Sequence, residues 1–401
     1  MYTKVFNRLE NPKRPLLGPN VRALQFWGLL FPKNTFKRYF YLTMHISVAV
    51  FTATEIIDVW FVKHNMNLLL NNLKITMLAT MSVCKVFTFL YWQKTWKSII
   101  DYVTKADVAQ RTTSDDKKLL LITKYTIYCR KITFFYWSLM YTTVIIVIMT
   151  PIFKYFFSPN YRDNVKNGTE TYLEVVSSWV PFDKNNFAGY LIASVYQSYA
   201  AIYGGGWITS FDTNAMVIMV FFKTELELLR IDCGDIFGSE KVRVPDKMIS
   251  ERLKNCHKRH VELIKYSTLF NSCLSPIMLL YMCVCSVMLC VTAYQITIEK
   301  SAAQRFLTTE YLVFGVAQLF IYCWHSNDVY FASQDLRMGP YESTWWLHRV
   351  HRKDLFILVA QFSKTVVFSA GPFTKLTVAT FLSILKGAYS YYTLLSQSQM
   401  K

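Results

Sequence analysis

Seven apolar stretches in this chain of 401 residues are each long enough to cross a lipid bilayer. A spanning helix needs about 20 apolar residues, because the hydrocarbon core of a bilayer is about 30 Å thick. Within that core every backbone N–H and C=O group must find a partner inside the protein, which a helix provides. The sequence therefore predicts an all-α, polytopic membrane protein. The predicted spans are residues 39–61, 68–92, 132–157, 187–222, 266–296, 306–324 and 376–395.

The composition agrees with this class and excludes others. Hydrophobic residues make up 53% of the chain and charged residues only 17%, whereas about 25% charged residues is usual in soluble domains. The formal net charge of +18 raises the question of nucleic acid, whose phosphates attract clustered Lys and Arg. Here the basic residues lie mainly between the apolar stretches. We therefore expect the lipid bilayer as a partner and no nucleic acid.

The distribution of charge predicts how the chain is oriented. Eight basic residues and one acidic residue precede the first span, whereas residues 158–185 carry three basic and four acidic residues. Segments rich in Lys and Arg stay in the cytoplasm. The N-terminus is therefore predicted to be cytoplasmic and, after seven spans, the C-terminus extracellular. Asn167 begins the sequence Asn-Gly-Thr, a glycosylation acceptor, in a loop that this orientation places outside.

The spans divide the chain into four predicted parts. Residues 1–35 form a cytoplasmic N-terminus with an amphipathic interfacial or re-entrant helix, and residues 36–325 form a bundle of six transmembrane helices. Residues 326–371 form a cytoplasmic anchor that is largely helical, and residues 372–401 contain the last span. An eighth span within residues 343–370 is the alternative, and the charges there disfavour it.

No catalytic constellation is evident in the sequence. It contains neither a Gly-x-Ser-x-Gly nucleophile elbow nor a phosphate-binding P-loop. Three consecutive glycines, residues 204–206, lie within a predicted span and indicate a helix irregularity or a point of close packing. Cys256, His257 and His260 lack a complete set of four zinc ligands and are interpreted as a solvated helix face. We therefore expect no enzyme activity, no metal and no cofactor.

The last span is unusually polar for a membrane helix. Its polar residues are Thr380, Ser383, Lys386, Ser390, Tyr391, Tyr392 and Thr393. A polar side chain inside a membrane needs a protein partner or water. Two interpretations remain open. The helix lines a water-filled pore that Leu394 or Leu395 closes by dewetting, or its polar side chains pack against neighbouring helices.

Six aromatic residues lie in the predicted outer halves of the spans. Together they would form an apolar pocket with a few hydroxyl groups, suited to a small volatile molecule. Ordinary packing between helices explains each of them singly about as well. The six are Trp137, Tyr141, Tyr196, Tyr199, Tyr311 and Phe314.

Three motifs in the C-terminal third resemble the tail of insect odorant receptors. They are residues 341–346 (YESTWW), 368–373 (FSAGPF) and 380–395 (TFLSILKGAYSYYTLL). The chain departs from the family pattern at residues 363–365 (SKT), where many relatives have a proline after the lysine, and this leaves open where the local helix ends. Outside these motifs the chain matches the family in length, number of spans and orientation.

The resemblance implies a ligand-gated, nonselective cation channel in the plasma membrane of olfactory neuron dendrites. Members of the family assemble as tetramers, usually with a shared odorant receptor co-receptor, and their ligands are small volatile odorants. The co-receptor has an enlarged loop after the fourth span. This chain is short there and therefore resembles a ligand-tuning subunit of a heterotetramer.

The resemblance also implies positions for the pore and the ligand pocket. In the family the last helix lines the central pore, and the alignment places the hydrophobic gate at Leu395 and a polar constriction near Ser398. The implied pore and gate residues are Tyr391, Leu394, Leu395, Ser398 and Gln399. The pocket lies between the second, third, fourth and sixth spans, where Met77 joins the six aromatic residues.

Three alternative identities fit parts of this pattern. An insect gustatory receptor shares the architecture but ends in a different motif, and Tyr389-Ser-Tyr-Tyr392 favours the odorant branch. A G-protein-coupled receptor requires an extracellular N-terminus, which the charge asymmetry opposes. A transporter or membrane enzyme is disfavoured because neither internal repeats nor a catalytic motif is evident.

Overall fold

The computed structural model describes residues 11–64, 66–238, 244–299 and 302–398, and these are almost entirely helical. The long helices are α3 (Thr35–Val62), α4 (Met66–Tyr91), α5 (Gln93–Gln110), α6 (Asp116–Phe157), α8 (Phe187–Gly234), α9 (Asp246–Ile298), α10 (Ala302–Asp335) and α13 (Val378–Ser398). The short elements are α2 (Gly18–Phe26), α7 (Pro159–Lys166), α11 (Met338–Glu342), α12 (Arg352–Gln361), the 3-10 turns η1 (Trp345–Leu347) and η2 (Arg349–His351), and the strands β1 (Ser369–Ala370) and β2 (Thr374–Lys375).

Seven of these helices correspond to the seven predicted spans, which overrun them by no more than two residues at α4 and α13. The seven are α3, α4, α6, α8, α9, α10 and α13. Among the described residues, α3, α4, α6 and α9 are apolar and long enough to cross a membrane on composition alone. The other three, α8, α10 and α13, carry more polar residues. Those of α8 are largely buried inside the bundle. Helices α6, α8 and α9 have 42, 48 and 53 residues, far more than the roughly 20 that a bilayer needs. They therefore extend well beyond the membrane.

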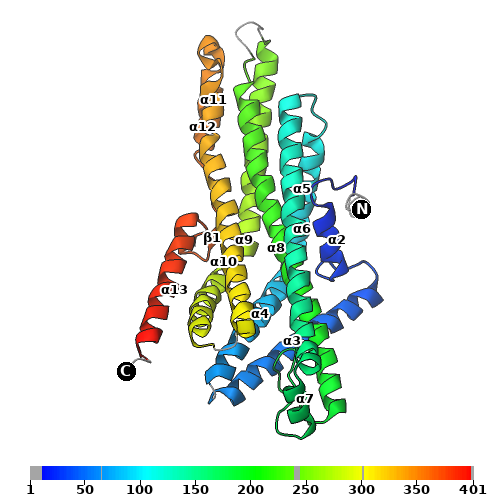
Figure 1. The fold of residues 1–401 in the computed structure, drawn as a ribbon. Helices are drawn as coiled ribbons and strands as arrows, with labels where there is room; N and C mark the ends of the chain where they lie inside the picture. Colours follow the sequence, from blue (N-terminus) through cyan, green and yellow to red (C-terminus); the bar gives the residue numbers. More distant parts are fainter. Residues whose placement is uncertain (1–10, 65, 239–243, 300–301, 399–401) are drawn as a thin grey trace.

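The long helices project together at one end of the molecule. Figure 1 shows the ends of α8, α9 and α10 rising with α11 and α12 at the top, while α7 lies at the opposite end. The segments at the top are the ones that the charge pattern places in the cytoplasm. The helix α13 lies on the outside of the bundle and contacts α9 and α10.

Local sequence explains where the helices begin and how closely they approach. The side chain of Asn34 accepts hydrogen bonds from the backbone N–H groups of Phe36 and Lys37, which starts α3. In α8, a Cβ atom at Gly206 would lie 2.3 Å from the ring of Trp27, which follows α2. Only glycine permits that approach. The close-packing interpretation of residues 204–206 is therefore confirmed, since α8 continues through them without a break.

Most of residues 326–371 is helical, as the end of α10, α11, the two 3-10 turns and α12. After α12 ends at Gln361 the chain leaves the helix and forms the β1–β2 hairpin. Side chains of α10 and α9 accept hydrogen bonds from this backbone. The N–H of Val366 donates to Ser333 Oγ at 2.9 Å, and that of Ser369 donates to Asn271 Oδ1 at 2.8 Å. Gly371 then turns the chain with a φ of 65°. These partners lie on other helices, so no local sequence pattern encodes the bonds.

The interpretation of Cys256 and His260 as solvated residues is wrong. Both are buried, His260 completely, and the His260 ring meets the edge of Phe362 at 4.8 Å between centroids. Helix α12 and the turn that follows it cover this face of α9, which the sequence alone left exposed. Burial, reinforced by the positive charges of His257 and Lys364, lowers the pKa of His260 to about 4.

This buried histidine predicts a loss of stability in acid. Because its folded-state pKa lies below the unfolded value of about 6.5, protonation favours unfolding, and the stability present above pH 6.5 is lost as the pH falls towards 4. The full shift is worth up to about 3 kcal/mol. We expect His260→Phe to reduce the fall in melting temperature of the purified protein between pH 6.5 and pH 4. His257→Gln, at an exposed position on the same helix, removes only the smaller contribution to the lowered pKa of His260 and should change the wild-type profile far less than His260→Phe. Equal behaviour of the two variants would contradict the assignment.

Candidate functional site

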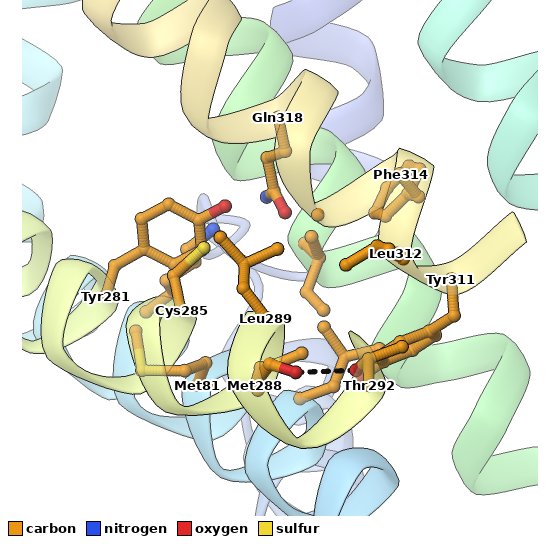
Figure 2. Close-up of a pocket in the computed structure, with 14 residues that line it drawn as sticks. Met81, Tyr281, Cys285, Met288, Leu289, Thr292, Tyr311, Leu312, Phe314 and Gln318 are labelled. Carbon is orange, nitrogen blue, oxygen red and sulfur yellow. Dashed lines mark hydrogen bonds between the residues drawn. The ribbon is translucent and has the colours of Figure 1, made fainter. Parts of the chain in front are cut away.

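A small enclosed cavity lies within the bundle between α4, α8, α9 and α10. Figure 2 shows Phe314 and Gln318 of α10 facing Cys285 and Leu289 of α9 across it. Its volume is about 20 Å³, enough for about one water molecule. The lining residues are Leu78, Met81, Lys85, Ile208, Tyr281, Cys285, Met288, Leu289, Thr292, Tyr311, Leu312, Phe314, Gly315 and Gln318.

Most of the cavity wall is apolar, and two of its hydroxyl groups are already engaged. Tyr311 donates to the carbonyl oxygen of Lys74 at 2.7 Å, which joins α10 to α4. Thr292 donates to the carbonyl oxygen of Met288 at 2.6 Å, one turn earlier in α9. Lys85 and Gln318 form the most polar part of the wall. Such a mixture of apolar surface and a few polar groups is typical of sites for small molecules.

Those two polar residues belong to a buried cluster around Asp212 of α8. Lys85 of α4 forms an ion pair with Asp212 at 2.6 Å, and these side chains are 2% and 0% exposed. The same carboxylate accepts hydrogen bonds from Tyr322 and Gln318 of α10 and from Tyr136 of α6. We call these five residues the Asp212 cluster.

The Asp212 cluster connects four helices beside the cavity. The ammonium group of Lys85 also lies 5.0 Å from the ring centroid of Tyr281, which brings in α9 as a fifth contact. A charge buried in a membrane protein requires an opposite charge and hydrogen-bond partners. Here Asp212 and Lys85 neutralise each other. Because Lys85 and Gln318 both line the cavity and both contact Asp212, a displacement of either side chain would also disturb the hydrogen bonds of the cluster.

The structure places two of the predicted pocket residues in the cavity wall, Tyr311 and Phe314. Met77 precedes the lining residue Leu78 on α4 and is half-buried, but it does not line the cavity. The cavity is lined by α4, α8, α9 and α10. The resemblance implies the third span, α6, where the structure has α9.

The other four predicted residues lie in two groups elsewhere. On α6, Trp137 stacks on Trp27 at 6.4 Å between ring centroids, and Tyr141 is 49% exposed. On α8, Tyr196 and Tyr199 stack at 6.2 Å and face α3. The hydroxyl of Tyr196 donates to the carbonyl oxygen of Ser47 at 2.8 Å.

Sequence reasoning missed Asp212 and Lys85, although a signal was present. Both lie inside predicted spans, and an ionisable residue within a membrane segment is by itself a reason to suspect a functional role. The α9 residues of the cavity carried no such signal. Tyr281, Cys285 and Leu289 are ordinary for an apolar helix, and only their spacing of four residues places them on one face.

The last helix, α13, presents two different faces. Phe381 and Ala388 are buried against the bundle, whereas Tyr391 and Leu394 are 64% and 63% exposed. The polar residues Ser383, Lys386 and Ser390 are exposed as well. Of the remaining predicted gate residues, Leu395 and Ser398 have side chains outside the described part of the structure, and Gln399 lies beyond the described residues altogether.

One ring contact connects the cavity helix to α13. Phe320 of α10 lies 5.3 Å from Phe381 of α13, centroid to centroid. Gln318, a member of the Asp212 cluster, is two residues away on α10. Displacement of α10 at the cavity would therefore reach α13 through a direct side-chain contact.

Comparison with known proteins decides the family. The sequence profile described as 7tm Odorant receptor matches residues 65–389, most of the chain. The chain belongs to the 7tm odorant receptor family. The resemblance seen in its C-terminal motifs is thus confirmed, and the family is one of receptors rather than enzymes.

Individual members of the odorant receptor family show how widely the likeness extends. Odorant receptor 30a of Drosophila melanogaster is 22% identical over 395 residues, which cover 96% of this chain and 97% of that protein. The odorant receptor coreceptor of Anopheles gambiae is 24% identical over 157 residues, or 39% and 33% of the two chains. The solved structure of the insect olfactory receptor OR5 from Machilis hrabei in complex with eugenol superimposes with a TM-score of 0.81 at 16% identity, covering 97% of this chain and all of that one. This odorant receptor is therefore a multi-pass, all-α membrane protein with seven transmembrane helices.

Proposed function

We propose that this receptor is the odorant-sensing subunit of a ligand-gated, nonselective cation channel. The observation that carries the proposal is the small apolar cavity whose wall includes α9 and α10, both of which contact α13. A small volatile molecule would bind in the cavity, against Tyr311 and Phe314. Movement of α10 would then open a central pore lined by α13.

Binding requires the cavity to widen. A volume of about 20 Å³ holds no odorant, because pockets for small organic ligands are usually about 300 Å³ or larger. The unbranched side chains of Met81 and Met288 can change rotamer at low cost to make room. Burying on the order of 300 Å2 of odorant surface would contribute about 7 kcal/mol before the costs of ordering.

A ligand shifts a gating equilibrium only if it binds the open form more tightly than the closed form. Widening the cavity provides that difference, since the contracted cavity excludes the ligand. Separation of α10 from α9 at Gly315 and Leu289, which face each other at the cavity, would displace Phe320. The contact between Phe320 and Phe381 would transmit this displacement to α13.

The exposed face of α13 supports a role in the pore. Ser383 donates to the carbonyl oxygen of Ala379, and Ser390 donates to that of Lys386, each at 3.0 Å. These hydroxyl groups are satisfied within their own helix and do not pack against α9 or α10. Hydroxyl groups satisfied in this way can also face lipid, but the ammonium group of Lys386, exposed on the same side, needs water or a partner from another subunit. Tyr391, Leu394 and Leu395 would then form the hydrophobic gate, followed by Ser398 and Gln399 at the constriction.

An arrangement of four subunits around a common axis would place these exposed faces in contact with one another and with the conduction path. We infer that this chain shares such a heterotetramer with the odorant receptor co-receptor. Its full-length likeness is to a specific odorant receptor, while its match to a co-receptor covers only 33% of that chain. The site of action would be the plasma membrane of olfactory neuron dendrites.

The decisive experiment is a current measurement in cells that express this chain with and without the co-receptor, using a mixed panel of volatile odorants. We expect an odorant-evoked inward cation current only when both chains are present. A membrane receptor that reaches the surface with the co-receptor, and responds by second-messenger release without a current, would contradict the channel assignment.

Glycosylation at Asn167 provides a separate test of orientation. Asn167 directly follows α7 and is exposed, at the end of the molecule opposite the predicted cytoplasmic extensions. We expect peptide N-glycosidase to increase the gel mobility of the wild-type receptor and to leave Asn167→Gln unchanged. A reporter fused at the N-terminus should remain inaccessible from outside the cell, and its labelling on intact cells would overturn the orientation.

A further inference from the structure

A broad groove lies between α5 and α9 on the predicted cytoplasmic side, away from the ligand cavity. It opens to solvent and has a volume of about 980 Å³. Tyr102 of α5 and Tyr266 of α9 form part of its wall, with their rings stacked at 4.0 Å between centroids and almost parallel. This contact joins the two helices at the groove.

Basic side chains dominate the groove once its internal ion pairs are taken into account. Two of its three acidic residues are already paired, Asp101 with Arg14 at 3.2 Å and Glu225 with Arg259 at 2.7 Å. Glu262 is the remaining acid. The lysines that line the groove are Lys94, Lys97, Lys105 and Lys265.

These four lysines, called the groove lysines below, are exposed. In the part of the chain that the structure describes, none of them forms an ion pair with a carboxylate. Glu225 and Arg259 belong to a network with Asp232 and Lys118 that contains two acidic and two basic side chains, so this network adds no net charge to the groove. The groove therefore holds four available positive charges against the single charge of Glu262.

The position of the groove relative to the membrane restricts what can occupy it. Helix α5 begins at Gln93, directly after the α4 span, so that Lys94 and Lys97 lie in the first turns beyond the hydrocarbon. Lys265 immediately precedes the predicted span of α9. Three of the groove lysines thus lie at the level of the lipid headgroups on the cytoplasmic side. Anionic lipids are concentrated in that leaflet, and basic pockets between helices are suited to bind them.

We propose that this groove binds a polyphosphorylated headgroup, that of a phosphoinositide in the cytoplasmic leaflet. Lysine ammonium groups act as point charges for phosphate, and a cluster of four matches a ligand with several phosphates better than a lipid with one negative charge. The open side of the groove leaves room for the acyl chains to remain in the bilayer. Because the groove is built from α5 and α9, occupancy would stabilise the cytoplasmic part of α9. Any effect on α13, which α9 also contacts, would be transmitted through the helix as a whole.

Binding to the purified full-length receptor tests the proposal. The probes are dioctanoyl phosphatidylinositol 4,5-bisphosphate, dioctanoyl phosphatidylserine and inositol 1,4,5-trisphosphate, each titrated and followed by native mass spectrometry. We expect the bisphosphate lipid to bind at least about tenfold more tightly than phosphatidylserine. Changing all four groove lysines to glutamine should weaken binding of the bisphosphate lipid by about tenfold or more.

A matched control separates a site from general surface charge. Four exposed cytoplasmic lysines outside the groove, changed to glutamine, alter the net charge by the same amount and should leave affinity within about twofold. The control lysines are Lys117, Lys124, Lys254 and Lys258. Glu262→Gln should strengthen binding, a gain that misfolding cannot produce.

The outcomes are distinct. Loss of binding confined to the groove variant, with a gain for Glu262→Gln, supports the site. Binding of inositol 1,4,5-trisphosphate at similar affinity would show that phosphates alone are recognised, and its failure to bind would show that the lipid anchor contributes. Equal losses in both quadruple variants, equal affinity for phosphatidylserine, or no binding of the bisphosphate lipid would each overturn the proposal.

Discussion

Replacing Asp212 with alanine is expected to remove most of the folded receptor from the cell surface. The change leaves Lys85 as an unpaired charge that is 2% exposed, and it removes the acceptor of Tyr136, Gln318 and Tyr322. Breaking a buried ion pair on one side costs about 3–5 kcal/mol, a large part of the roughly 5–15 kcal/mol that stabilises a typical domain. Surface biotinylation and the melting temperature of the detergent-purified protein would measure the effect.

A double variant that neutralises both Asp212 and Lys85 provides the control. Asp212→Asn combined with Lys85→Met removes both charges and keeps an acceptor for the tyrosine hydroxyl groups. This double variant should be more stable than Asp212→Ala, because no isolated charge remains in the bundle. If Asp212→Ala alone reaches the surface at the wild-type level, the Asp212 cluster does not stabilise the bundle as described.

Replacing Gly315 with leucine is expected to abolish odorant activation, or to raise the half-effective concentration by about 100-fold or more, while the receptor still reaches the membrane. A Cβ atom at Gly315 would meet only Leu289 Cδ2, at an ordinary distance of 3.8 Å. A leucine side chain would therefore enter the cavity and occupy the space that the ligand needs. Overpacking of this kind costs about 1–3 kcal/mol, which is tolerable for the fold.

The smaller substitution Gly315→Ala is the matched control. It adds one methyl group in van der Waals contact and should change odorant potency by no more than a few fold. Both variants are compared by dose–response currents with the co-receptor, normalised to surface abundance. An unchanged response of Gly315→Leu would show that odorants bind elsewhere, for example among Trp137, Tyr141, Tyr196 and Tyr199.

The spans could be predicted from the sequence because the bilayer imposes a length and a polarity on each one independently of its neighbours. Which helices adjoin was not predictable in the same way. Tyr311 and Phe314 were identified as aromatic residues in the outer half of a span, and the structure places both at the cavity. Trp137 satisfied the same criterion, yet it stacks on Trp27, because the direction in which an aromatic ring points depends on a partner more than 100 positions away.

Contacts between distant segments also explain where the structure differs from the prediction in the cytoplasmic region. The sequence indicated a largely helical anchor, but the backbone N–H groups of Val366 and Ser369 donate hydrogen bonds to Ser333 and Asn271 instead, and no local pattern contains these partners. The complementary error concerns His260. Its charged neighbours on α9 suggested solvent, and the face it occupies is covered by Phe362 from a distant segment.

The separation of Lys85 and Asp212 along the chain affects how the receptor is made. The two residues are 127 positions apart, and a ribosome adds about 5–20 residues per second. For roughly 6 to 25 s, α4 must therefore wait in or near the translocon with a lysine that costs about 3 kcal/mol in lipid. Only the arrival of α8 neutralises it. Biogenesis of this receptor thus contains a built-in delay during which membrane chaperones can retain or discard the nascent chain.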